Sequence, residues 1–129
     1  MAKTFREMVA EARQAVEVIS PEQAQERMKS NPKVLVVDVR EPDDRVANGA
    51  IPGSVNIPLG LVPLRADTEL PEQFRDARLQ DRSAPIITTC GGGGQAALAA
   101  KTLWDMGFTN VAIMDGGTNG WKNAGLSTE

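Results

Sequence analysis

The single cysteine of the chain, Cys90, is the residue best suited to covalent chemistry. It lies between the apolar, β-branched run 86–89 and four consecutive glycines, Gly91–Gly94, and an alanine- and leucine-rich run follows at 95–100. The first run predicts a buried strand, and the last predicts the start of a helix. Cys90 is therefore expected at the carboxyl end of a strand, facing a helix amino terminus. A thiolate is stabilised at such a place, and open α/β sheets bind their ligands there.

The residues available to activate this thiol are few, because the chain has one cysteine and no histidine. A Cys–His pair and a disulfide within the chain are excluded, and we expect neither a metal site nor a cofactor. A single free cysteine favours a reducing, cytoplasmic compartment. The helix amino terminus supplies up to about 2 kcal/mol toward the thiolate. The four glycines can turn successive amides into one anion-binding concavity.

The overall composition excludes several classes of partner. The net charge is −3 and no basic cluster occurs, so a nucleic-acid partner is not expected. No apolar run approaches about 18 residues, which argues against a membrane span. Residues 1–7 carry charges of both signs without an apolar segment, so we expect no secretory signal. The length of 129 residues fits one domain, 1–129.

The elements that must position Cys90 alternate between strands and helices. Phe5, Met8, Val9, Ala12, Val16 and Ile19 recur at helical spacing, which predicts an amphipathic helix over 4–17. This helix either packs on its own domain or serves a dimer or partner protein. The other expected elements are a helix at 21–29, a strand at 34–37, a helix at 42–48, a strand at 55–57, the strand 86–89, a helix from 96 to 107, a strand at 111–114 and a last helix from 119. Residues 59–83 give a weak pattern. The alternation predicts an α/β fold with a central, mostly parallel sheet and helices on both faces.

Four separated segments of the chain match one family in order, spacing and strand context. They are Asp38-Val39-Arg40-Glu41, the segment Gly49–Pro58, the Cys90 loop, and Gly116-Gly117 followed by Trp121 and Gly125. With these segments the chain resembles a single-domain rhodanese over about residues 18–127. Residues 1–17 would then be an amino-terminal helical extension of a rhodanese-like fold.

The resemblance implies sulfurtransferase chemistry. Cys90 would take a sulfane sulfur from a donor, hold it as a persulfide and pass it to an acceptor such as cyanide or a thiol. Gly91, Gly92, Gly93, Gly94 and Gln95 would form the loop that cradles the persulfide. The partners would be a small sulfur donor and a thiol, cyanide or protein acceptor. The alternative is a persulfide carrier or sensor without turnover, or a protein-binding module with the same fold. The oligomeric state is left open.

Three positions depart from the family pattern. Gln95 and Ala96 stand where the cysteine loop commonly has an arginine and a hydroxyl residue, and Ala50 stands where a histidine is common. One cation about 4 Å from a thiosulfate dianion would contribute up to about 4 kcal/mol. We therefore expect weak use of thiosulfate and better use of a polysulfide or persulfide. A C-x5-R phosphatase or arsenate reductase is disfavoured because the arginine that clamps the oxyanion in such a loop is missing. A nucleotide-binding loop is also disfavoured, because Gly91–Gly94 lacks the G-x-x-x-x-G-K-S/T pattern of such loops.

Asp38 and Arg40 are the expected supporting residues, since they follow the strand 34–37. Their charges allow a catalytic role. The favoured interpretation is an ion pair or backbone cap that stabilises the turn after the strand.

Overall fold

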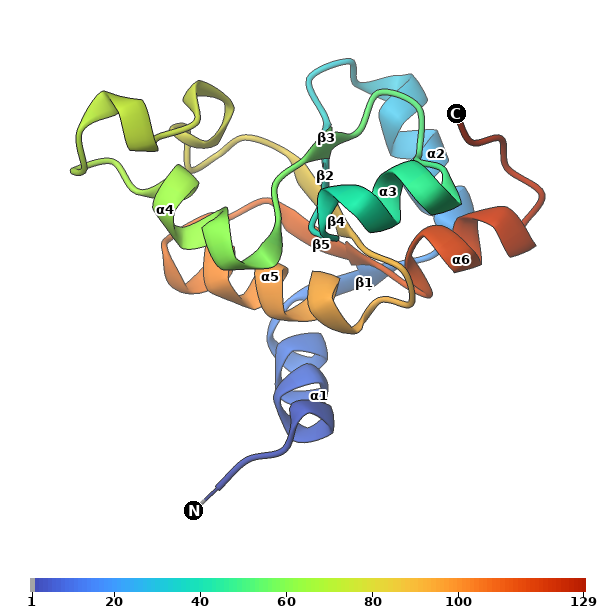
Figure 1. The fold of residues 1–129 in the computed structure, drawn as a ribbon, viewed down its shortest axis with the longest axis horizontal. Helices are drawn as coiled ribbons and strands as arrows, with labels where there is room; N and C mark the ends of the chain where they lie inside the picture. The colour runs from blue at the N-terminus through green and yellow to red at the C-terminus, as the bar shows by residue number, and fades with distance from the viewer. Residues whose placement is uncertain (1) are drawn as a thin grey trace.

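The fold is built on a five-stranded parallel sheet, whose strands follow one another from β3 at the top to β1 at the bottom in the middle of Figure 1. The computed structural model describes residues 2–129, so Met1 of the expected domain 1–129 lies outside the described residues. The strand order is β1-β5-β4-β2-β3. The strands are β1 (Glu17–Ile19), β2 (Leu35–Asp38), β3 (Val55–Asn56), β4 (Ile86–Thr89) and β5 (Val111–Met114). The helices are α1 (Phe5–Ala15), α2 (Pro21–Ser30), α3 (Pro42–Asn48), α4 (Val62–Ala66), α5 (Gly94–Asp105) and α6 (Gly117–Asn123). The expected α/β class with a mostly parallel sheet is confirmed.

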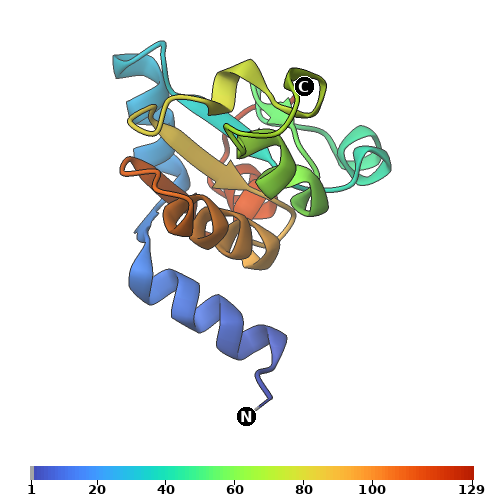
Figure 2. The same ribbon diagram turned by 90° about the vertical axis from the view of Figure 1, so that its left-hand side faces the viewer.

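Both faces of the sheet are covered, which explains why its central strands lack polar alternation. Successive residues of a strand point to opposite faces. Val37, Ile86 and Ile113 pack in one buried cluster with side chains of α1, α4 and α5. Val36 and Ile87 pack in a second cluster with α2 and α6. In Figure 2, α5 (orange) lies in front of the strands and α6 (red) lies behind them.

The order of the strands places a switch point beside Cys90. From β2 the chain continues outward to β3, whereas from β4 it continues in the other direction to β5. The carboxyl ends of β2 and β4 are neighbours, with Asp38 opposite Thr89 in the register. Crevices at such points are where open α/β sheets bind ligands. The turn after β2 and the loop after β4 thus meet at one edge of the sheet.

The amino-terminal segment differs from the expected helix over 4–17. α1 ends at Ala15, and Val16 already has extended backbone angles. Residues Glu17–Ile19 then form β1, pairing with Ala112–Met114 of β5. Val16 and Ile19 were wrongly assigned to the helical pattern. Apolar residues three apart fit a helix period, but the β-branched run here favours a strand once a sheet edge is available.

The weakly patterned segment 59–83 contains short elements only. These are α4 and three 3-10 turns, at Leu59–Leu61, Glu72–Phe74 and Ala77–Leu79.

The expected start of α2 at residue 21 is confirmed. Ser20 and Gln23 form a reciprocal capping box, and Pro21 occupies the first turn of the helix.

A buried ion pair fixes the turn after β2. The guanidinium of Arg40 donates to the carboxylate of Asp38, with Nη2 at 2.7 Å from Oδ2, and it also donates to the carbonyl of Gly49 at 2.8 Å. The side chains of Arg40 and Asp38 are 2% and 0% exposed. The expected ion pair is therefore confirmed. It ties the turn after β2 to the segment that leads into β3.

Asp38→Asn should destabilise the protein by about 3–5 kcal/mol, because it removes the buried carboxylate that hydrogen-bonds the Arg40 guanidinium and leaves only the half-exposed Asp44, at 4.0 Å. The matched control is Asp76→Asn. Asp76 pairs with Arg78 at the same spacing and the same 2.7 Å, but the Arg78 side chain is 52% exposed. That control should lose about 1 kcal/mol or less. Urea unfolding of both variants measures the difference, and equal losses would contradict the assigned role of burial.

Candidate active site

Cys90 lies directly after β4 with its sulfur buried against the start of α5. The residue is 2% exposed. The backbone amide of Gly93 donates to Sγ at 3.0 Å, and the amide of Ala96 donates to it at 3.4 Å. Hydrogen bonds to a sulfur anion favour the charged form. The geometry therefore provides the backbone stabilisation of a thiolate that the sequence predicts.

Two neighbouring elements hold the backbone on either side of this sulfur. Thr88 of β4 donates from its hydroxyl to the carbonyl of Ala96 at 2.8 Å, which fixes the first turn of α5. On the other side, the amide of Thr118 donates to the carbonyl of Cys90 at 2.6 Å, and the amide of Asn119 donates to the carbonyl of Gly91 at 3.0 Å. The carbonyls of the loop are thus turned toward α6. The N–H of a trans peptide points opposite to its C=O, so the amides of residues 91 and 92 face away from α6.

Four further amides of the loop are available to a ligand. Within residues 2–129, the N–H groups of Gly91, Gly92, Gly94 and Gln95 donate to no backbone or side-chain acceptor of the chain. Gly92 and Gln95 are exposed, and Gly91 and Gly94 are half-buried, so a ligand can reach these amides from solvent. Successive free amides next to a sulfur are typical of an anion-binding site.

The four glycines have different structural requirements. Gly93 has φ of +104°, a left-handed conformation that favours glycine, and it precedes the first residue of α5. A side chain on Gly94 would collide with Phe5 of α1. A side chain on Gly91 or Gly92 would meet nothing within 4 Å. Packing does not require glycine at 91 and 92, and the absence of side chains there leaves the mouth of the loop open.

The loop is shorter than the sequence suggests. Gly94 and Gln95 belong to the first turn of α5, which begins two residues earlier than expected. Gln95 is exposed, and Ala96 is fully buried. The last helix also begins earlier than expected, at Gly117, after Gly116 in a left-handed conformation. The structure brings the five predicted loop residues and Cys90 together.

The turn after β2 places a cation within electrostatic range of Cys90. The pKa of Arg40 is raised above its usual value, chiefly because the guanidinium hydrogen-bonds to Asp38. Burial opposes this, and the charges of Asp38, Asp44 and the Cys90 thiolate add to it. The Cys90 contribution is the smallest of these causes, and Arg40 is held chiefly by its ion pair with Asp38. Sequence reasoning noted the pair but not its proximity to Cys90.

Two residues of the site were not predicted as functional. Thr118 and Asn119 hold the carbonyls of the loop through their backbone amides, and the hydroxyl of Thr118 lies 3.3 Å from that of Thr89. The Gly116-Gly117 motif was the available signal for this contact.

In the described part of the chain, no group of three or more His, Cys, Asp or Glu side chains is arranged to hold a metal. In residues 2–129, no helix combines the length and apolarity needed to cross a membrane.

Gly117→Ala should distort the cysteine loop. Gly117 has φ of +58°, and an added methyl would lie 2.5 Å from the carbonyl oxygen of Cys90 and 2.8 Å from that of Gly91. Gly53→Ala is the matched control, because Gly53 has φ of +80° but open space around it. The control should lose about 1 kcal/mol from backbone strain, and Gly117→Ala about 2–3 kcal/mol more. Thermal and urea unfolding measure both losses. Equal losses would mean that the close approach of α6 does not hold the loop.

Comparison with known proteins places this geometry in a family. Residues 20–124 match the model of the rhodanese-like domain. A sulfurtransferase from Allochromatium vinosum is 30% identical over 86% of this chain and 92% of its own length. A protein from Schizosaccharomyces pombe named "probable 3-mercaptopyruvate sulfurtransferase" is 32% identical over 93% of this chain. This chain spans only 43% of that relative.

Solved structures share the fold. A protein of unknown function from Rhodopseudomonas palustris, described as a "possible tyrosine phosphatase", has a TM-score of 0.91 and 32% identity, with 100% of this chain and 96% of that chain covered. The polysulfide-sulfur transferase homodimer from Wolinella succinogenes has a TM-score of 0.74 and 29% identity, with 97% and 86% covered. The cysteine loop, the parallel sheet and these matches agree: the chain belongs to the rhodanese-like domain family.

Proposed function

We propose that this protein is a sulfurtransferase that carries a sulfane sulfur as a persulfide on Cys90. The observation that supports the proposal most strongly is the set of amides around Sγ. Two amides, those of Gly93 and Ala96, already donate to the sulfur, and four others of the same loop are free. This arrangement suits an anion that is one sulfur longer than a thiolate.

The reaction takes place in two displacements. The Cys90 thiolate attacks the terminal sulfur of a persulfide donor, R–S–S⁻. A new S–S bond forms at Cys90, the donor's S–S bond breaks, and the bonding pair leaves with the thiolate R–S⁻. An acceptor thiolate then attacks the outer sulfur of the Cys90 persulfide. The sulfur passes to the acceptor, and the Cys90 thiolate is regenerated. No external oxidant or reductant is needed.

The loop favours donors that do not depend on a cation. Gln95 is an exposed amide side chain on the first turn of α5. Its neutral amide offers only a dipole, whereas a cation at this position would attract the second negative charge of thiosulfate. We propose polysulfide or a protein-bound persulfide as the donor and a small or protein thiol as the acceptor. The Wolinella protein, by its name a polysulfide-sulfur transferase, is consistent with this choice.

A phosphatase activity is the competing proposal, because the Rhodopseudomonas neighbour is described as a possible tyrosine phosphatase. In the C-x5-R loop the arginine would occupy the position of Ala96 here. That alanine is fully buried and donates its backbone amide to the sulfur. Without a guanidinium at this place, a phosphate dianion has no bidentate partner in the loop. The site fits a sulfur atom better than a phosphate dianion.

The free thiol of Cys90 suits a reducing compartment, so we propose a cytoplasmic location.

Intact-mass spectrometry tests the persulfide directly. After incubation with polysulfide, the protein should gain about 32 Da, one sulfur atom, and Cys90→Ser should gain nothing. Cyanide or a thiol should remove the added mass. A stable adduct that no acceptor discharges would favour a carrier without turnover. Absence of an adduct from any donor, or hydrolysis of a phosphotyrosine mimic instead, would refute the proposal.

Gln95→Arg should raise kcat/KM for thiosulfate:cyanide transfer by about tenfold or more. The added guanidinium would supply a partly screened share of the ~4 kcal/mol that a nearby cation contributes. Gln73→Arg is the matched control, since Gln73 is exposed on a distant 3-10 turn and the variant adds the same charge. Steady-state kinetics with thiosulfate and with polysulfide separate the two effects. No gain for Gln95→Arg over the control would show that the missing cation does not limit thiosulfate use.

A further inference from the structure

Phe5, near the amino end of α1, packs directly on the first turn of α5. A methyl group placed on Gly94 would lie 2.8 Å from Cζ and 3.1 Å from Cε2 of the Phe5 ring. The next nearest atom is Cγ2 of Val9, at 3.8 Å. Both side chains belong to α1, which lies beneath α5 and runs along it in Figure 2. α1 precedes residues 20–124, the part of the chain that matches the family model.

Gly94, which the Phe5 ring contacts, lies in the sequence between the two residues whose amides donate to the Cys90 sulfur. Gly93 donates its amide to Sγ of Cys90 at 3.0 Å, and Ala96 does so at 3.4 Å. Gly94 is the first residue of α5, and its own amide is among the free ones. A glycine at this position would move easily because it has no side chain to anchor it. The ring supplies the contact that a side chain at 94 would otherwise provide.

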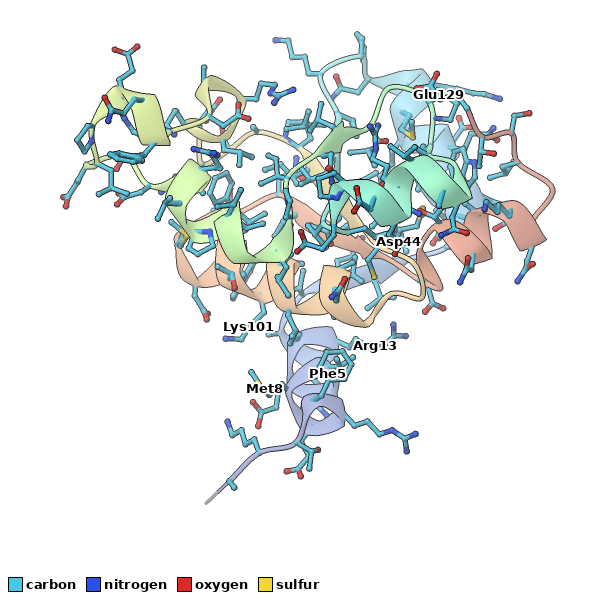
Figure 3. All side chains as sticks on the ribbon, in the orientation of Figure 1. Phe5, Met8, Arg13, Asp44, Lys101 and Glu129 are labelled. Atoms are coloured by element: carbon cyan, nitrogen blue, oxygen red, sulfur yellow. The ribbon has the colours of Figure 1, made fainter. Side chains whose placement is uncertain are left out.

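α1 is fixed well enough to act as a support. Ala12 is fully buried and Val16 is 3% exposed, and Arg13 pairs with Asp115 at 3.0 Å beyond the end of β5. Phe5 itself is 54% exposed, so its contact with Gly94 adds little to the core. In Figure 3, Phe5 and Arg13 point to one side of α1, and Met8 points to the other. The Phe5 side of α1 is therefore the side that supports the site.

We propose that Phe5 is a positioning residue of the sulfur site. Its ring holds Gly94 and so keeps the amides of Gly93 and Ala96 directed at the Cys90 sulfur. This inference rests on the proposed sulfurtransferase function. It makes α1 a working part of the site rather than an accessory extension.

The test compares loading rates of Cys90 with polysulfide, followed by intact-mass spectrometry over time. The Phe5→Ala protein should gain sulfur on Cys90 about tenfold more slowly than the wild type. This loss is smaller than the loss caused by removing a preorganised hydrogen-bond donor, because the amides are displaced rather than removed. Phe5→Met should stay within about threefold of the wild type, because a flexible apolar chain can reach the same contact. Met8→Ala is the matched control. Met8 is 45% exposed on the same helix, and its truncation should lower Tm as much as Phe5→Ala while leaving the loading rate within about twofold.

Gly94→Ala tests the same contact from its other side. The new methyl would displace the exposed ring, and alanine favours the helix, so Tm should not fall. The loading rate should nevertheless drop about tenfold, as in Phe5→Ala. In the double variant, Phe5→Ala with Gly94→Ala, the two losses should not add, because they break one contact.

The outcomes separate this inference from the proposed function. If the wild type loads sulfur but Phe5→Ala loads as fast as Met8→Ala, the positioning role is overturned and the proposed function stands. Additive losses in the double variant would also overturn it, since Gly94 would then act without Phe5. If the wild type takes up no sulfur from polysulfide, the proposed function fails and this inference fails with it.

Discussion

The structure depends on one arrangement, in which backbone N–H groups converge on the sulfur of Cys90. The sulfur accepts from the amides of Gly93 and Ala96, at 3.0 Å and 3.4 Å. The carbonyls of Cys90 and Gly91 accept from amides at the start of α6, which turns the N–H groups of Gly91 and Gly92 away from α6. That docking requires Gly117, where a methyl group would lie 2.5 Å from the carbonyl oxygen of Cys90. The parallel sheet and its switch point bring α5 and α6 to the same edge.

This arrangement stabilises a charge without placing a full charge in the mouth of the loop. Amides on a rigid backbone need little reorganisation when a sulfur anion forms, so they are effective at low cost in entropy. They favour a singly charged sulfur, whereas a dianion gains more from a cation. The buried cation Arg40 is already paired with Asp38 at 2.7 Å. The donor preference that we propose follows from a loop that offers amides and no unpaired cation.

The sequence predicts the site better than it predicts the elements around it. Cys90 could be placed because a β-branched strand, a glycine run and an alanine-rich helix are strong local signals. The ion pair of Asp38 and Arg40 could be expected because two residues of opposite charge end an apolar strand. β1 could not be recognised, since its three residues become a strand only by pairing with β5. The contact of Phe5 with Gly94 joins residues 89 positions apart, and no local pattern encodes it.

The central claim is that backbone amides hold the transferred sulfur, and amide NMR spectra before and after loading with polysulfide test it most directly. The account predicts that the amide resonances of Gly91, Gly92, Gly94 and Gln95 shift and that their hydrogen exchange slows, because these N–H groups gain an acceptor. Amides of similar exposure far from the loop, such as Gly60, should not change. If the loaded protein shows one added sulfur on Cys90 but these four resonances stay where they were, the amides do not hold the sulfur and the account is wrong.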